Sequence, residues 1–211
     1  MTELPDYYET VAEEMLHKCH PREGVWLDLG AGPGGVGLAL AKRSTSAIVL
    51  IDPNESALQE ALNSARKADL IGRFVAIVGQ AEAIPLSDNC IDLAVSRGSI
   101  FFWKDRAQGL REVCRILRPG GAAMIGGGMG ESYPEWARRE FIRRRHESVK
   151  RRGPDAFKRF KEARSSRTFR QLAEEAGLAD FEVTGDGGHD PDSPKVGLGI
   201  WLRFRKEEKT V

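Results

Sequence analysis

The 211-residue sequence has little cysteine, no long hydrophobic run and no visible targeting segment. Its three cysteines, Cys19, Cys90 and Cys114, show neither the short spacings of a zinc site nor the even count of a disulfide framework. No apolar run approaches the roughly 18 residues that span a bilayer. The first residues lack the basic-then-apolar order of a signal peptide. We therefore expect reduced thiols, no contact with a membrane and a cytoplasmic location.

Histidine is also scarce, and the two signs of charge are nearly balanced. No metal site is expected, because metal-ligand spacing is absent from the four histidines, which are His17, His20, His146 and His189. The net charge of +1 argues against a nucleic-acid-binding protein that is basic throughout. It conceals an asymmetry, because residues 134–170 contain 14 Lys and Arg against 5 Asp and Glu. The rest of the chain is therefore net negative.

Strand-like and helix-like segments alternate along the sequence. Short apolar runs bounded by glycine or polar residues predict buried parallel strands at 25–29, 47–51, 73–78, 91–96 and 122–126. Helical periodicity predicts helices at 7–18, 36–42, 53–65, 106–117 and 169–176, with 118–121 as the turn into the fifth strand. Two further strands, 181–184 and 198–205, form a hairpin-like pair that should complete a sheet edge. This alternation predicts one α/β domain with a doubly wound sheet, spanning residues 1–211.

The first predicted strand runs into a glycine-rich loop, Gly30-Ala31-Gly32-Pro33-Gly34-Gly35. A strand-to-helix turn presents free backbone N–H groups and the positive end of the helix to a ligand, and glycine lets the ligand come close to the backbone. Gly30, Gly32 and Gly35 fit the G-x-G-x-x-G pattern of dinucleotide sites. The loop alone leaves three interpretations open: NAD(P), S-adenosylmethionine (SAM) or a purely structural turn.

Two carboxylates beside the loop favour SAM. Asp28 lies within the apolar strand, at a position that normally stays apolar in a nicotinamide site because a negative pyrophosphate lies close by. SAM instead brings a sulfonium and an ammonium. Asp52 ends the second strand, 22 residues after Gly30, where a carboxylate can accept hydrogen bonds from both ribose hydroxyls of either ligand. Each has a structural alternative: Asp28 as an anchor for loop amides, and Asp52 as the N-cap of the helix that begins at Pro53.

The run from Val25 to Gly34 resembles motif I of the class I SAM-dependent methyltransferases, in their type 11 subgroup. Segments 51–54, 79–86, 90–96, 117–121 and 169–178 resemble later motifs of that family in the same order, and the resemblance covers residues 20–130 and 168–205. It implies a Rossmann-like, seven-stranded, mostly parallel sheet with an antiparallel C-terminal strand, and methyl transfer from SAM. The cofactor-binding residues that it implies are Asp28, Gly30, Ala31, Gly32, Gly34, Asp52, Pro53, Gln80, Ala81, Glu82, Ser96 and Arg97. Gln80 departs from the family, which usually has Asp there to meet the adenine amino group.

The segment from Ser96 to Trp103 leaves the carboxyl end of the fourth strand, where ligands of open α/β sheets bind. Arg97 is suited to hold an anionic substrate or the carboxylate of SAM in a bidentate manner. The candidate substrate residues are Tyr8, Ser99, Phe102, Trp103 and Gly128. Alternatively, two of the aromatic residues at 101–103 cover the following helix, and Tyr8 packs against the sheet. The glycines at 126–130 mark a close approach of another group, a hinge or a flexible connector. No catalytic residue is assigned, since methyl transfer from a sulfonium depends mainly on proximity and alignment.

The basic stretch belongs to an insertion at residues 131–168, which interrupts the alternation after the fifth strand. Gly153-Pro154 splits it into two predicted helices. As a lid, which we favour, it would cover a small-molecule acceptor, with an anionic acceptor as one option. As an electrostatic surface it would make the protein an RNA methyltransferase, and as a solvated hairpin or dimer surface it would have no substrate role. A SAM- or dinucleotide-binding protein without catalysis is the other class, and monomer and homodimer both stay open.

Overall fold

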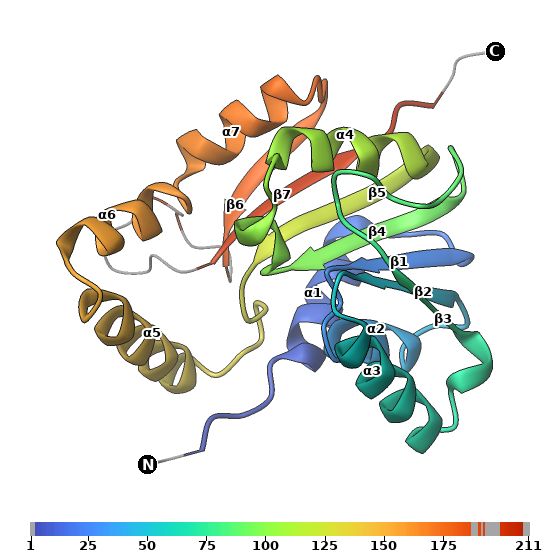
Figure 1. Ribbon diagram of the computed structural model, residues 1–211, viewed down its shortest axis with the longest axis horizontal. Helices are drawn as coiled ribbons and strands as arrows, with labels where there is room; N and C mark the ends of the chain where they lie inside the picture. Colours follow the sequence, from blue (N-terminus) through green and yellow to red (C-terminus); the bar gives the residue numbers. More distant parts are fainter. Residues whose placement is uncertain (1–2, 187–189, 191, 193–198, 209–211) are drawn as a thin grey trace.

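A seven-stranded sheet forms the centre of the protein, whose computed structural model describes residues 3–186, 190, 192 and 199–208 (Figure 1). The strands lie in the order β3-β2-β1-β4-β5-β7-β6. Their bounds are β1 Val25–Leu29, β2 Ala47–Asp52, β3 Phe74–Val78, β4 Ile91–Arg97, β5 Leu117–Gly127, β6 Phe181–Gly185 and β7 Ile200–Arg205. Strand β7 is antiparallel to both β5 and β6, and the other neighbouring strands are parallel. The predicted fold class is confirmed.

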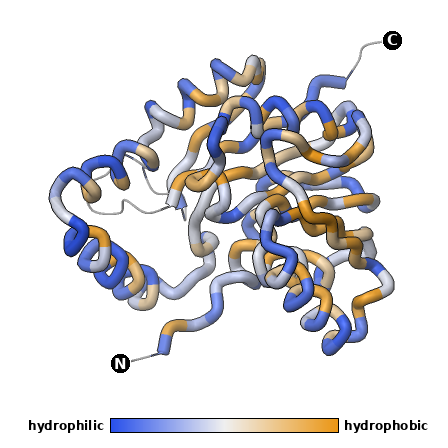
Figure 2. The backbone as a smooth tube through the Cα atoms, in the orientation of Figure 1, coloured by the Kyte–Doolittle hydropathy of each residue, from blue (hydrophilic) through white to orange (hydrophobic). Residues whose placement is uncertain are grey.

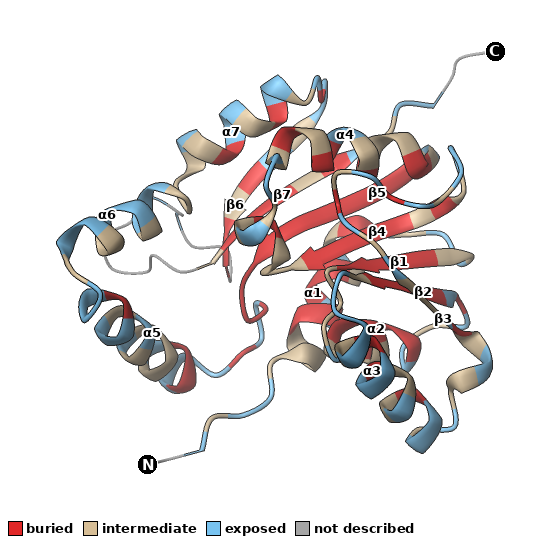
Figure 3. Cartoon of the chain, viewed as in Figure 1, coloured by how far each residue is buried: buried red, intermediate tan, exposed pale blue. Residues whose placement is uncertain are grey.

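Helices cover both faces of the sheet (Figures 1 and 3). Helices α1 (Tyr8–Cys19), α2 (Gly35–Ala41) and α3 (Glu55–Lys67) pack on one face, and α4 (Arg106–Ile116) and α7 (Ser166–Glu175) pack on the other. Two short 3-10 helices, η1 (Ile71–Arg73) and η2 (Ser99–Phe102), follow α3 and β4. Alternate residues of a strand point to opposite faces, so in β2 Ile48 and Leu50 face α1–α3 while Val49 and Ile51 face α4 and α7. Burial on both sides explains why the strands are continuous apolar runs in the sequence.

Helix α3 begins two residues later than predicted, and its cap is a different residue. Its first residue is Glu55, and the side-chain oxygen of Asn54 accepts a hydrogen bond from the Ala57 N–H at 3.2 Å. The prediction of Asp52 as the N-cap is therefore wrong. Asn54 caps the helix, and the Asp52 carboxylate instead accepts a hydrogen bond from the glycine loop.

The segment predicted as a turn at 118–121 lies instead within β5, which begins directly after α4. The C-terminal strand explains this difference. The Gly120 N–H donates to the Lys206 carbonyl at 2.8 Å, and the Lys206 N–H donates to the Gly121 carbonyl at 2.9 Å. These bonds hold the segment in the sheet, although Gly120 has a φ of +77° and residues 118–121 form an irregularity in the pairing of β5 with β4. The C-terminal pair adds to the sheet beside β5 with β6 outermost, and the predicted strand start at 198 lies outside the described residues.

The insertion after β5 forms two helices, α5 (Glu135–Lys150) and α6 (Pro154–Glu162), beyond the carboxyl ends of the parallel strands (Figure 1). Both are strongly hydrophilic compared with the sheet (Figure 2). A buried ion pair ties α5 to the sheet: Arg138 contacts Asp186, the residue after β6, and each side chain is 3% exposed. Within the described ranges, no helix has both the length and the apolar character needed to cross a bilayer.

Candidate functional site

The glycine loop between β1 and α2 requires glycine at three positions because of its backbone shape. Gly30, Gly32 and Gly34 have φ angles of +72°, +52° and +78°, in the left-handed region where residues with a Cβ are strained. Gly35 has no positive φ, but a Cβ there would lie 2.5 Å from the ring of Tyr8. The backbone therefore marks a G-x-G-x-G loop, and the match to G-x-G-x-x-G depends on a glycine that serves helix packing.

Asp28 lies behind this loop and is buried within β1. Its Oδ2 accepts a hydrogen bond from the Gly37 N–H, in the first turn of α2, at 2.9 Å. Burial raises the pKa of Asp28 to about 7, and the Asp52 charge adds to this effect while the Gly37 N–H opposes it. The geometry matches the structural alternative, an anchor for a backbone amide beside the loop.

Asp52 holds the loop from the cavity side. Its Oδ2 accepts from the Gly32 N–H and its Oδ1 from the Asn54 N–H, both at 2.8 Å. The carboxylate is partly exposed and borders a cavity of about 590 Å³, a size within the roughly 300–1,000 Å³ of small-molecule sites. Carboxylate oxygens have more than one lone pair, so Asp52 can anchor the loop and still accept a hydrogen bond from a ligand hydroxyl.

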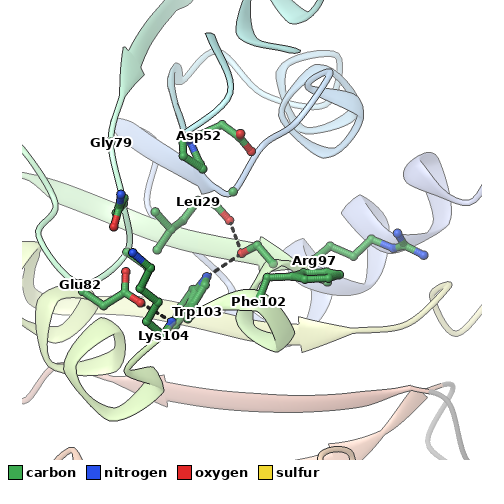
Figure 4. Close-up of a pocket in the computed structure, with 14 residues that line it drawn as sticks. Leu29, Asp52, Gly79, Glu82, Arg97, Phe102, Trp103 and Lys104 are labelled. Carbon is green, nitrogen blue, oxygen red and sulfur yellow. Dashed lines mark hydrogen bonds between the residues drawn. The ribbon is translucent and has the colours of Figure 1, made fainter. Parts of the chain in front are cut away.

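This cavity, the larger of two that the site contains, lies at the carboxyl ends of β1, β2 and β4 (Figure 4). It is lined by seven predicted cofactor residues, Gly30, Asp52, Pro53, Gln80, Ala81, Glu82 and Arg97, and by three predicted substrate residues, Ser99, Phe102 and Trp103. The lining residues that sequence analysis missed are Leu29, Gly79, Gly98 and Lys104. Outside the lining lie Asp28, Ala31, Gly32, Gly34 and Ser96. The Glu82 carboxylate fixes the start of α4, since its Oε1 accepts from the N–H groups of Lys104 and Asp105 at 2.6 and 3.1 Å.

Ser99 packs helix η2 onto the glycine loop. Its hydroxyl donates to the Leu29 carbonyl and accepts from the Trp103 Nε1–H, both at 3.0 Å (Figure 4). A Cβ at Gly30 would lie 2.1 Å from the Ser99 Cβ, so Gly30 is needed for this packing as well as for its φ angle. Trp103 in turn lies where a Cβ of Gly109 would be, in α4. This position fits the alternative in which an aromatic residue covers the following helix.

A smaller cavity of about 230 Å³ adjoins the larger one, next to α5 and α6. Three residues line both cavities: Arg97, Gly98 and Phe102. The other residues of the smaller cavity are Tyr7, Phe101, Gly127, Gly128, Met129, Phe141, Arg145, Phe160, Arg164 and Gly199. Of the predicted substrate residues, Phe102 and Gly128 are in this lining. Tyr8 is not, because its ring packs against α2, and burial raises its pKa to about 12.

Arg97 stands between the two cavities. Its Nε donates to the Gly128 carbonyl at 2.7 Å, and its guanidinium lies 3.7 Å from the centroid of the Tyr7 ring. The side chain extends away from Glu82 and Lys104 (Figure 4). Stacking on the ring and bonding to the backbone together fix the position of its charge.

The glycines after β5 surround a carboxylate that sequence analysis did not single out. Asp186 Oδ1 accepts from the N–H groups of Met129 and Gly130 at 2.9 and 3.0 Å, while its Oδ2 contacts Arg138. A Cβ at Gly128 would lie 2.4 Å from the same Oδ1. These glycines therefore mark a close approach, one of the predicted alternatives. No local pattern distinguishes this Asp and Arg in the sequence, because the pair forms between distant segments.

Known proteins resemble this chain in sequence and in fold. A family model described as a methyltransferase domain matches residues 27–125. A solved structure from Methanococcus maripaludis, described as an S-adenosyl-L-methionine-dependent methyltransferase, is similar over 97% of this chain and 87% of its own. Its sequence identity is 31% and the TM-score is 0.75.

Two further similarities are more limited. An uncharacterized methyltransferase of Mycobacterium tuberculosis is 42% identical over 95 residues, which are 45% of this chain and 36% of the relative. The match therefore spans little more than a third of that relative's length. A phosphoethanolamine N-methyltransferase of Haemonchus contortus, solved with S-adenosyl-L-methionine, shares the fold, with a TM-score of 0.60 and 23% identity. That similarity covers 83% of this chain and 38% of the nematode chain.

Proposed function

We propose that this chain, which belongs to the class I SAM-dependent methyltransferases, binds SAM in the larger cavity and methylates a small molecule held in the smaller cavity. The observation that carries the proposal is the wall of Arg97, Gly98 and Phe102 that the two cavities share. A donor and an acceptor in these cavities would meet at that wall. Proximity and alignment of this kind are worth up to roughly 7–11 kcal/mol of an activation barrier.

The groups around the larger cavity suit SAM. Apart from the neighbouring residues, no atom of the described residues lies within 4 Å of the position that a Cβ of Gly32 would take, so a ligand can approach the loop there. Asp52 offers oxygens to the ribose hydroxyls, and Gln80 and Ala81 line the cavity where the family's adenine-contacting motif falls. Asp28 would act indirectly, by holding the first turn of α2. We assign the remaining cofactor contacts to the predicted loop residues Gly30, Ala31 and Gly34 and to Ser96 and Arg97 at the end of β4.

SAM supplies a methyl group on a sulfonium, whose carbon–sulfur bond breaks as the acceptor atom bonds to the methyl carbon, leaving S-adenosylhomocysteine. The protein contributes binding, orientation and exclusion of water. Phe101, Phe141 and Phe160 form apolar walls of the smaller cavity, and the last two belong to α5 and α6. These helices are therefore the proposed lid over the acceptor.

An RNA acceptor is favoured by no specific feature of the structure. Most arginines of α5 are already paired within the helix: Arg139 with Glu135, Arg143 with Glu140 and Glu147, and Arg144 with Glu140. Pairing lowers the charge that remains for phosphates. The cytoplasmic location and the choice between monomer and homodimer stay predictions.

Calorimetry with SAM and with NADH tests the donor assignment. We expect SAM to bind and NADH not to bind, and tight NADH binding without SAM binding would overturn the proposal. Methyl-labelled SAM, incubated with pools of small molecules and separately with RNA, then tests transfer. Label in a small-molecule product supports the proposal, label in RNA alone contradicts the acceptor class, and SAM binding without any transfer favours a non-catalytic protein.

A further inference from the structure

The smaller cavity is lined by two arginines that have no ion-pair partner among the described residues. Arg145 of α5 and Arg164, which lies between α6 and α7, line it together with Arg97. Among the residues that the structure describes, neither Arg145 nor Arg164 has an ion-pair partner, although the other arginines of α5 all have one. The residues outside that description include no Asp or Glu. The residues outside the described ranges therefore offer these arginines no acidic side chain.

Arg164 is held between two aromatic rings. Its guanidinium carbon lies 3.7 Å from the centroid of the Phe101 ring and 4.0 Å from that of Phe160. Burial, with repulsion from Arg145 and Arg106, lowers the pKa of Arg164 to about 10. The rings fix the plane of the guanidinium, while its N–H groups make only a long 3.4 Å bond to the Phe160 carbonyl within the described structure. A positioned, partly desolvated fork of donors is suited to an oxyanion.

Arg145 brings a second charge to the same place. Its guanidinium carbon lies 5.7 Å from the centroid of the Phe160 ring that Arg164 also contacts. The two guanidinium groups near this ring repel each other. A bound anion would attract both of them and so offset the repulsion. Arg97 differs, since the buried Asp186 carboxylate interacts with its charge. The unbalanced charge is therefore that of Arg145 and Arg164.

We propose that the methyl acceptor is a small molecule with an oxyanion, either a carboxylate or a phosphate monoester, on an apolar body, and that Arg145 and Arg164 bind the oxyanion. This inference rests on the proposed function. Tyr7, Phe102 and Met129 provide the apolar contacts. The volume of about 230 Å³ is slightly below the roughly 300 Å³ at which ordinary ligand pockets begin, a size that suits a small molecule. These two arginines line the smaller cavity and not the larger one, so the oxyanion would lie away from the shared wall. The methylated atom would then belong to the apolar body of the acceptor.

Calorimetry on the intact protein with S-adenosylhomocysteine present tests the inference. The probes are benzoate and phenyl phosphate, with neutral benzyl alcohol for comparison. We expect an anionic probe to bind at least tenfold more tightly than benzyl alcohol. Arg145→Gln and Arg164→Gln should each lower that affinity at least tenfold and weaken its dependence on salt. Arg139→Gln is the matched control, because Arg139 lies on the same helix but is paired with Glu135, and it should leave the affinity unchanged.

The outcomes separate this inference from the proposed function. Equal affinity for the three probes, or unchanged affinity in both glutamine variants, would overturn the inference while SAM binding by the same protein still supports the function. Failure of the wild-type protein to bind SAM overturns the function instead. If Arg164→Gln does not fold, Arg164→Lys keeps the charge without the planar fork and should show an intermediate loss. A preference for benzoate or for phenyl phosphate supports the inference and identifies the oxyanion.

Discussion

The two cavities that meet at Arg97 are built in different ways. The larger is formed by loops at the ends of parallel strands, and its carboxylates, Asp52 and Glu82, already accept hydrogen bonds from backbone N–H groups. The smaller is formed by side chains from α5, α6 and segments before α1 and α7, and two of its arginines have no acidic partner among the described residues. The first site is preorganised by the fold, whereas the second would be completed by its ligand. Variants that affect one cavity and spare the other test this difference.

Arg138→Ala should have the largest effect. It leaves Asp186 buried without its ion-pair partner, and removing one member of a buried pair costs about 3–5 kcal/mol of the free energy of unfolding. Urea denaturation measures the loss. Arg139→Ala is the control, because Arg139 is 77% exposed, and its change should stay within about 0.5 kcal/mol. Under conditions where the variant is folded, affinity for the anionic probes should fall more than affinity for SAM. An equal fall in both would contradict separate construction of the cavities.

Two alanine substitutions in the glycine loop should differ from each other. Gly30→Ala places a Cβ against Ser99 in addition to straining the backbone, and should cost about 2–4 kcal/mol. In the described part of the chain, the Cβ of Gly32→Ala meets no atom within 4 Å beyond its chain neighbours, so only the backbone strain of about 1 kcal/mol remains. We expect the opposite order for SAM affinity, because a Cβ at position 32 would stand on the open side of the loop, where we propose that the ligand approaches the backbone. Denaturation and SAM calorimetry on both variants check this, and equal stability losses would contradict the packing role of Ser99.

The larger cavity could be predicted from sequence because its residues are local to strand ends. A short motif gives both the strand and the side chain at its carboxyl end, as with Asp52 at the end of β2. One error arose where a distant segment pairs with the chain, and another where two local patterns compete. The Pro-Gly-Gly at 119–121 predicts a turn, but hydrogen bonds with Lys206 place it within β5, where Gly120 keeps a positive φ of +77°. The start of α3 was misplaced because Asp52-Pro53 and Asn54 both fit the pattern of a helix start.

Of the residues that line the smaller cavity, Arg97, Phe102 and Gly128 were predicted, and the others were not because they come together only in the folded chain. One local signal was present in the sequence. Arg143 and Arg144 have glutamates three or four positions away on α5, but Arg145 has Phe141, Ile142, Ser148 and Val149 at those positions. Helical spacing therefore singled out Arg145 as the arginine of this group without a partner on its own helix. No comparable signal marks Arg164, whose environment is set by Phe101 from another part of the chain.

Stability should fall as pH rises from about 4 to about 7, owing to two buried carboxyl groups, Asp28 of β1 and Glu14 of α1. Burial raises the pKa of both Asp28 and Glu14 to about 7, and Asp186 and Glu131 add to the effect at Glu14. Each group binds more protons in the folded than in the unfolded protein across this range, so the stability it contributes is present at low pH and lost as pH rises. Glu14→Gln and Asp28→Asn should each reduce the loss by about 2 kcal/mol. Denaturation at about pH 5 and about pH 8 measures it, and an unchanged slope in both variants would contradict the raised pKa values.

Asp52→Ala should have the smallest effect and the most selective one. We expect SAM affinity to fall about tenfold, or about 1.4 kcal/mol, because water can solvate the ribose hydroxyls that lose their acceptor. Asp52 also holds the Gly32 N–H, so Asp52→Asn, whose amide oxygen can keep one of these bonds, should fall between the wild type and the alanine variant. Glu60→Ala, an exposed change on α3, controls for lost surface charge. Calorimetry should show unchanged affinity for the anionic probes in all three variants. If probe affinity instead falls in step with SAM affinity, Asp52 supports both cavities and their independence is wrong.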